Sequence, residues 1–239
     1  MQPDLAERAT AGLHDHIFRC IVALIPNKAS RVLDVGCGTG AMLSRLKESG
    51  YLNLIGADID PPFHLPGVSL HRQDLDCPSL PLAEESIDLC VAIELIEHLE
   101  SPGMLLAELR RVLRPGGIVL ITTPNVHSIE ARVRWMFVAN LKQFDSKGDP
   151  THITPIFRFP FRRLVERHGF IVTKEWGFLE NGSSPSSRPS LRLLARFVRL
   201  LGLRGQPDGD VLCLALQKSQ PEAGAANQDK QQILTAHYR

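Results

Sequence analysis

The sequence lacks the cysteine pattern of a disulfide-stapled protein. Its five cysteines are scattered, odd in number and never spaced as CxxC. This pattern argues against a disulfide framework and a thiolate zinc site, and it favours a reducing compartment. Long apolar runs are missing too: none approaches the roughly 18 residues that span a bilayer, and the charged first twenty residues do not fit a signal-peptide core. We therefore expect a cytoplasmic protein.

An excess of charge of one sign is also absent. The chain has 27 Lys and Arg against 26 Asp and Glu, so its formal net charge is +1 and nothing draws it as a whole to an anionic polymer. No basic patch with interleaved aromatic residues stands out, and we expect no nucleic-acid partner. Apolar residues make up 44% of the 239, which is enough to fill the core of one α/β domain of ordinary size.

Apolar runs alternate with helical patterns along the chain. Seven short runs rich in Val, Ile and Leu predict the buried strands of a mostly parallel sheet: 31–35, 53–58, 68–72, 87–93, 117–123, 170–176 and 210–216. The gaps hold helical patterns at 40–49, 102–113 and 156–168. With right-handed crossovers, this order predicts an α/β fold in which a doubly wound seven-stranded sheet carries helices on both faces.

The same patterns suggest how the chain is divided. Residues 1–29 are expected to form an N-terminal helical segment, and residues 30–218 the main domain. Two helical insertions are expected within that domain, at about 126–144 and 188–205. The polar composition of residues 219–239 predicts a flexible tail.

A glycine-rich turn follows the first predicted strand, in the stretch VLDVGCGTG at residues 32–40. Its glycines would let the backbone approach a ligand with no Cβ in the way, at the sheet edge where doubly wound folds bind ligands. The looser dinucleotide fingerprint fits these residues as well. Charge separates the two interpretations, because Asp34 would repel a pyrophosphate. It would favour the ammonium and sulfonium of S-adenosylmethionine.

Two further carboxylates close the next predicted strands. Asp58 ends the second apolar run 22 residues after Gly36, where a carboxylate can hold a ribose diol. Asp74 follows the third run, where it can meet an adenine amino group with Leu75 beside the ring. Either Asp alone could simply cap the turn that follows it. Acids at three consecutive strand ends favour a ligand site.

These motifs resemble the class I S-adenosylmethionine-dependent methyltransferases, which have a Rossmann-like fold. VLDVGCGTG resembles the first motif of that family and GADID its ribose acid. QDLDCPSLPLAEESIDLCVAIELIEHL resembles the segment leading into the fourth strand, and LRPGGIVLITTPN the stretch entering the fifth. The resemblance covers about residues 30–178 and says little about the methyl acceptor. It implies S-adenosylmethionine as cofactor, bound by Asp34, Gly36, Cys37, Gly38, Gly40, Asp58, Ile59, Asp74, Leu75, Ile93 and Glu94.

A polar constellation follows the fourth predicted strand, in AIELIEHLESP. Glu94, Glu97 and His98 are spaced i, i+3 and i+4 and can share one face of a helical turn, and His152 follows later in DPTHITP. This pattern is similar to metal-dependent members of the superfamily, the ubiquinone-type catechol O-methyltransferases and the small-RNA 2′-O-methyltransferases. The similarity implies that these four residues are catalytic and bind a divalent ion such as Mg²⁺, which would lower the pKa of an acceptor hydroxyl.

A metal-free interpretation of the constellation stays open. The Glu-His pair also occurs in relatives that need no metal, where the histidine is a hydrogen-bonding group or a base, and Glu97 could cap the next segment. A fold relative that binds the cofactor or a partner without catalysis is the other class of function. The intact acids at the strand ends favour the enzyme.

The two inserted segments suggest the kind of acceptor. Residues 126–144 predict a helix that is apolar on most sides, which either packs on the core or covers a lipophilic acceptor. Residues 188–205 place arginines and leucines on separate stripes of a helix, which either packs as an ordinary surface helix or touches an anionic membrane. We expect a small-molecule or lipid-linked acceptor. The sequence leaves the oligomeric state open.

Overall fold

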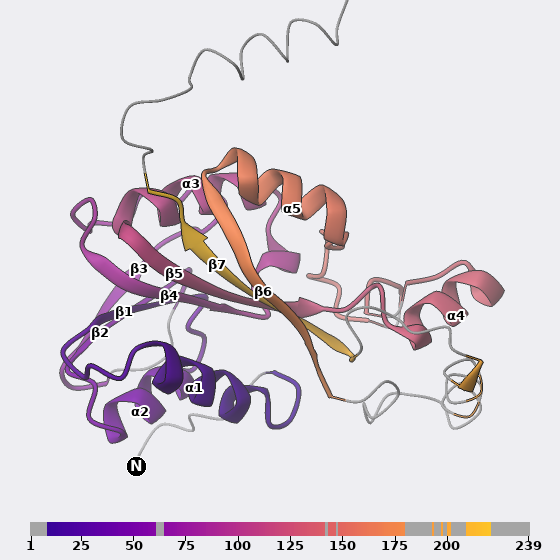
Figure 1. Ribbon diagram of the computed structural model, residues 1–239, viewed down its shortest axis with the longest axis horizontal. Coiled ribbons are helices and arrows are strands. Elements are labelled where there is room, and N and C mark those ends of the chain that lie inside the picture. The colour runs from indigo at the N-terminus through magenta and orange to yellow at the C-terminus, as the bar shows by residue number, and fades with distance from the viewer. Residues whose placement is uncertain are drawn as a thin grey trace, which may run out of the picture.

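The chain forms one twisted sheet with helices on both faces (Figure 1). The computed structural model describes residues 9–60, 65–141, 143–146, 148–179, 193, 197, 200, 201 and 209–220. Strands and helices alternate through most of this length, as the sequence predicts. The predicted fold class is thus confirmed.

The sheet has seven strands in the order β3-β2-β1-β4-β5-β7-β6. Their bounds are β1 Arg31–Val35, β2 Asn53–Asp58, β3 Val68–Arg72, β4 Ile87–Ile93, β5 Leu113–Pro124, β6 Phe170–Phe178 and β7 Val211–Lys218. All pairs are parallel except those of β7, which runs antiparallel to both β5 and β6. The strand order reverses between β1 and β4, so a doubly wound sheet of this kind binds its ligand beyond the carboxyl ends of these two strands.

Two hydrophobic cores hold the helices onto the sheet. The helices are α1 Leu13–Leu24, α2 Ala41–Glu48, α3 Pro102–Val112, α4 Ile129–Val138 and α5 Arg158–Arg167, with a short 3₁₀ turn η1 at Ile96–His98. α1 and α2 cover one face, where Ile17 and Leu43 pack against strand residues such as Val91. α3 and α5 cover the other, where Leu105 and Val165 are fully buried (Figure 1). This layering leaves the carboxyl edge of the sheet to the loops.

Some element bounds differ from the predicted ones for local reasons. β5 begins at Leu113, four residues early, because Leu113 already pairs with Ile87 on β4, and the register then shifts before Ile118 pairs with Leu89. The helix predicted at 126–144 is shorter, since the Ser128 side chain caps its start by accepting from Ala131 N and Ala139 ends it in a left-handed conformation. α4 lies beyond the end of β5, away from the helices on the two faces (Figure 1).

Two predicted segments fall largely outside the described residues. Of the helix predicted at 188–205, only Leu193, Phe197, Leu200 and Leu201 are described, and their side chains are exposed. Of the tail predicted at 219–239, Ser219 and Gln220 are described, and Ser219 N donates a hydrogen bond to Gly169 O. Within the described part of the chain, no helix has the length and hydropathy needed to cross a membrane.

Candidate functional site

The glycine turn between β1 and α2 forms one wall of the site. All three of its glycines have positive φ: 71° at Gly36, 50° at Gly38 and 81° at Gly40. Gly36 N donates to Ala57 O at 2.8 Å, which ties the turn to the end of β2. A Cβ built on Gly36 would lie 2.8 Å from a methyl carbon of Leu95. The positive φ and the nearby Leu95 side chain therefore both require glycine at position 36, independently of any ligand.

Two of the predicted acids lie beside this turn. Asp58, at the end of β2, accepts a hydrogen bond from Gly38 N at 2.8 Å through its Oδ2 atom. Asp34 lies on β1 and is 3% exposed. Its register partners are Gly56 on β2 and Val91 on β4, so it sits at the reversal point of the strand order. Both acids are therefore at the edge where the fold binds ligands.

The surroundings of Asp34 favour the neutral, protonated form of its carboxyl. Burial, and after it the charge of Asp58, raises the pKa of Asp34 from its ordinary 3.8 to about 8. A cation placed beside it would favour the ionised form. The turn therefore offers a buried carboxylate to a positively charged ligand.

The raised pKa of Asp34 makes the stability of the ligand-free protein depend on pH. The folded state holds this proton more tightly than the unfolded state, so the contribution is full below about pH 4 and is lost as the pH rises through about 8. We expect the free energy of unfolding to fall from about pH 5 to about pH 8, and to fall less in Asp34→Asn. Urea unfolding of both proteins across this range measures the difference. Equal slopes would mean that Asp34 ionises normally.

The remaining predicted cofactor residues are placed unevenly around the turn. Asp74 Oδ1 accepts a hydrogen bond from Asp76 N at 2.9 Å. This acid therefore caps the turn that follows it, which is the alternative to cofactor binding that the sequence left open. Leu75 is buried, whereas Ile59 is exposed. The Cys37 side chain is buried beside Gly56 of β2, and its Sγ would be 3.0 Å from a Cβ built on that glycine. Cys37 therefore acts in the packing of the turn.

The end of β4 carries Glu94 in an unusual backbone conformation. Its φ is 48°, in the left-handed region that non-glycine residues rarely adopt. Thr122 on β5 fixes it twice: Glu94 N donates to Thr122 Oγ1 at 3.0 Å, and Thr122 Oγ1 lies 3.1 Å from Glu94 Oε1. Burial raises the pKa of the Glu94 carboxyl to about 7. Thr122 thus anchors the Glu94 side chain at the edge of the sheet where the parallel strands end, and the pKa of this side chain lies near neutral pH.

Glu97 in η1 is a fully buried acid. Its side chain is 0% exposed, and neither carboxyl oxygen has a hydrogen-bond partner in good geometry among the described residues. Burial, with the nearby charge of Glu94, raises its pKa well above the ordinary value. A buried carboxyl without partners is costly to a fold. Hydrogen bonds of good geometry to the described residues therefore do not account for the burial of the Glu97 carboxyl.

The segment around His152 folds back onto η1 through main-chain hydrogen bonds. Ile153 N and Thr154 N both donate to Glu97 O, at 3.0 and 2.9 Å. The rings of His98 and His152, 54 residues apart in the chain, thereby come to 4.7 Å between centroids. Glu97, His98 and His152 each place one ligand atom within 4.8 Å of the others. The structure brings together three of the four predicted residues, and Glu94 lies outside this group.

Both histidines of this cluster lie with Nδ1 beside a main-chain carbonyl. His152 Nδ1 lies 3.0 Å from Gln143 O, and His98 Nδ1 lies 3.2 Å from Thr151 O. A main-chain carbonyl only accepts, so the contact with Gln143 O places a proton on His152 Nδ1 and leaves a lone pair on its Nε2. His98 Nδ1 also lies 2.8 Å from Thr151 Oγ1, so its tautomer depends on that hydroxyl as well. This arrangement is typical of histidines that bind a metal or act as bases.

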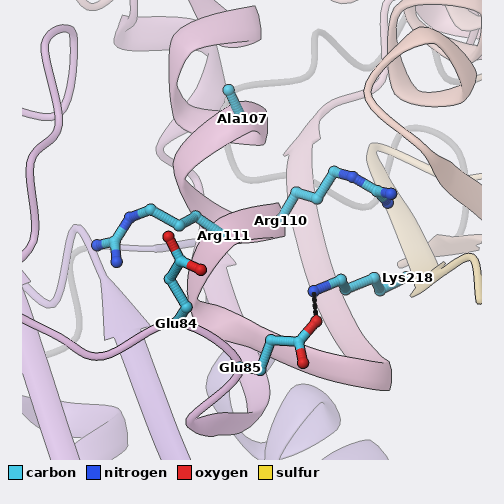
Figure 2. A pocket seen from close by; sticks show the side chains of 6 residues that line it. All are labelled: Glu84, Glu85, Ala107, Arg110, Arg111 and Lys218. Carbon is cyan, nitrogen blue, oxygen red and sulfur yellow. Dashed lines mark hydrogen bonds and ion pairs between the residues drawn. The ribbon is translucent and has the colours of Figure 1, made fainter.

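A charged surface pocket of about 330 Å³ lies at the opposite edge of the sheet (Figure 2). Lys218 ends β7 there, and Nζ bonds to Glu85 Oε1 at 3.0 Å and Leu113 O at 2.7 Å. Arg110 and Arg111 point in opposite directions (Figure 2), and they bond to Gly169 O and Glu108 respectively. Because its cations are engaged by the protein, this pocket ties chain segments together and is a poor ligand site.

Comparison with known proteins agrees with the geometry at the carboxyl edge. The methyltransferase domain family matches residues 7–175, and the chain belongs to this family of S-adenosylmethionine-dependent methyltransferases. The ubiquinone biosynthesis O-methyltransferase of Cereibacter sphaeroides is 28% identical over 134 residues, which cover 52% of this chain and 53% of that protein. The chain thus spans about half the length of the curated relatives it matches.

Solved structures share the fold. A SAM-dependent methyltransferase from Archaeoglobus fulgidus has a TM-score of 0.58 at 22% identity, over 86% of this chain and 94% of that one. The [4+2]-cyclase SpnF has a TM-score of 0.55 at 17% identity, over 87% of this chain and 81% of that one. The fold therefore accommodates other named activities, and methyl transfer has to be argued from the site.

Three polar residues of the site escaped the sequence analysis: Thr122, Asp149 and Thr151. Thr122 pairs with Ile93 in the register of β4 and β5, so a polar residue at the end of a buried strand was the available signal. Asp149 and Thr151 precede His152 in DPTH, where Asp and Thr commonly form local turns. The contact of Thr151 with His98 depends on the fold-back of this segment, and Asp149 is bonded to Thr151.

Proposed function

We propose that this chain transfers a methyl group from S-adenosylmethionine to an oxygen of a small or lipophilic molecule. The observation that carries the proposal is the cluster of Glu97, His98 and His152 at the same sheet edge as the glycine turn. Methyl transfer from a sulfonium is an in-line displacement, so alignment of donor and acceptor supplies much of the acceleration. An oxygen acceptor must also lose a proton, and the cluster offers groups that can accept one.

The cofactor would be held by the carboxylates and glycines of the turn. Asp58 would accept from the ribose hydroxyls while it keeps Gly38 N, and the buried Asp34 would balance the positive charge of the methionine part. Because the pKa of Asp34 is raised to about 8, cofactor binding near neutral pH should release a proton. Leu75 would provide an apolar surface for the adenine.

The cluster also fits a divalent cation. Neither Glu97 oxygen has a hydrogen-bond partner in good geometry among the described residues, and both histidines lie with Nδ1 beside a main-chain carbonyl, which leaves each Nε2 available to an ion. Two imidazoles and a carboxylate suit a borderline divalent ion such as Mn²⁺ better than the harder Mg²⁺. When bound, such an ion lowers the pKa of an acceptor hydroxyl. Glu94 remains at the cofactor side through its bonds to Thr122.

The exposed end of α4 supports an acceptor with apolar parts. Ile129, Ala131 and Val133 are buried, whereas Trp135 and Phe137 are 57% and 69% exposed. These two aromatic side chains follow β5, the strand beside β4, and so belong to the edge at which the site opens. An amphipathic or lipid-linked acceptor would cover them. Aromatic side chains in such a place favour ring-containing molecules.

Chelation tests the proposed cation independently of the proposed cofactor site. With S-adenosylmethionine and a panel of phenols, quinols and aliphatic alcohols, we expect a methylated product by mass spectrometry. EDTA should abolish its formation yet leave cofactor binding nearly unchanged, because the turn and the cluster use different side chains. Mg²⁺ or Mn²⁺ should restore turnover in the wild type and not in His152→Ala. Full turnover in EDTA would assign the histidines to metal-free proton transfer.

A result in which no member of the acceptor panel is methylated would also be informative. Cofactor binding with no methylation of any oxygen acceptor would favour a relative that binds the cofactor without transferring its methyl group to oxygen. Methylation of an amine or thiol panel under the same conditions would keep the enzyme and replace the acceptor atom.

A further inference from the structure

We infer that Asp149 and Thr151 are positioning residues that fix His98 as the tautomer with its proton on Nδ1. Thr151 Oγ1 lies 2.8 Å from His98 Nδ1, closer than the carbonyl oxygen of the same residue at 3.2 Å. The inference rests on the proposed function, since it concerns the use of His98 in the same cluster. It adds two residues that no motif of the family suggested.

The hydrogen bonds from His98 through Thr151 to Asp149 form a chain. The direction of each bond follows from the acceptor at the end of the chain, Asp149. Thr151 Oγ1 donates to Asp149 Oδ1 at 2.6 Å, and Thr151 N donates to the same oxygen at 2.9 Å. A main-chain N–H can only donate, so Asp149 Oδ1 is an acceptor, and the two bonds also lower the pKa of this carboxyl. The single hydroxyl proton of Thr151 is therefore committed to Asp149. Its oxygen can then only accept from His98 Nδ1.

The same polarity at both histidines has a chemical consequence. The Gln143 carbonyl holds the proton of His152 on Nδ1, and the Asp149–Thr151 pair does so for His98. Both rings then keep a lone pair on Nε2. If the Thr151 hydroxyl pointed the other way, His98 would carry its proton on Nε2 and could neither bind a cation nor take a proton there.

The segment that carries the pair is itself held in place. Ile153 N and Thr154 N bond to Glu97 O, and the Thr154 hydroxyl donates to Leu99 O. These contacts lie immediately after Thr151 and do not involve its side chain. Replacing the Thr151 hydroxyl should therefore change the tautomer of His98 while the fold-back of the segment persists.

Two variants of Thr151 test the inference in the ligand-free protein. Thr151→Val removes the hydroxyl at nearly constant shape, and Thr151→Ser keeps it. Long-range ¹H–¹⁵N correlation at about pH 8.5, with His98 assigned through His98→Asn, reports which ring nitrogen carries the proton. We expect Nδ1–H in the wild type and in Thr151→Ser, and a substantial Nε2–H population in Thr151→Val. The change is partial because the Thr151 carbonyl remains as an acceptor.

A titration with Mn²⁺ alone provides the second readout. Loss of a histidine's outer partner typically weakens metal affinity 10- to 100-fold, and we expect roughly 10-fold for Thr151→Val because Thr151 and Asp149 are exposed. Thr151→Ser should bind as the wild type does. Nε2–H in the wild type, or an unchanged tautomer in Thr151→Val, would overturn the inference. These NMR results stand without any turnover, so a protein that methylates nothing would remove the proposed function and leave the positioning role intact.

Discussion

Glu97→Gln should abolish methyl transfer while leaving the ligand-free protein as stable as the wild type or more so. The side chain is fully buried, and its carboxyl oxygens have no hydrogen-bond partner in good geometry among the residues that the structure describes. The ionised form therefore carries a desolvation cost that a neutral amide of the same shape avoids. Turnover should fall by roughly 10²- to 10⁴-fold, the range for a lost catalytic group. Steady-state kinetics and urea unfolding measure the two effects.

The opposite signs of these effects distinguish a functional acid from a structural one. Glu100→Gln is the matched control, because Glu100 is exposed three residues further on and should change neither quantity. A Glu97→Gln protein that is strongly destabilised would show that the carboxyl holds the fold. One that turns over normally would remove Glu97 from the chemistry.

Asp58→Ala should weaken S-adenosylmethionine binding by the loss of charge-assisted hydrogen bonds to the ribose. Such bonds contribute about 1.5–3 kcal/mol, or roughly 10- to 150-fold in the dissociation constant. The Ala variant also releases Gly38 N, to which Asp58 is bonded at 2.8 Å. Asp58→Asn keeps an acceptor for that N–H and loses only the charge, so its affinity should lie between those of the wild type and Asp58→Ala.

Isothermal titration of the three proteins with S-adenosylmethionine checks this order. Asp60→Ala is the control at the same loop, since Asp60 is exposed and pairs with Arg72. A dissociation constant unchanged in Asp58→Ala would remove Asp58 from the cofactor site. A comparable loss in Asp60→Ala would point to a general effect of charge at this edge.

Much of the sheet and one wall of the site were predictable from the sequence. Buried strands read as apolar runs, and acids such as Asp34 and Asp58 stand out at their ends because parallel strands bring these ends to one edge. The turn with Gly36 was predictable because positive φ selects glycine. The packing of the Leu95 side chain against this turn was not predictable, because nothing in the local sequence indicates which residue packs there.

The geometry of the polar cluster could be predicted only in part. The spacing of Glu97 and His98 indicates one turn, but His152 arrives through bonds from main-chain N–H groups to Glu97 O, which leave no side-chain signature. Glu94 was expected in the cluster because i and i+3 positions share a helical face. Its left-handed backbone and its bonds to Thr122 turn the residue toward β5 instead.

The most direct test of the account is a calorimetric titration of the wild-type protein with S-adenosylmethionine and, separately, with NAD. The buried Asp34 and the Asp58 carboxylate beside the glycine turn favour a cationic ligand and disfavour a pyrophosphate. We therefore predict saturable binding of S-adenosylmethionine, with release of a proton near neutral pH, and no measurable binding of NAD. Binding of NAD in preference to S-adenosylmethionine would contradict the account.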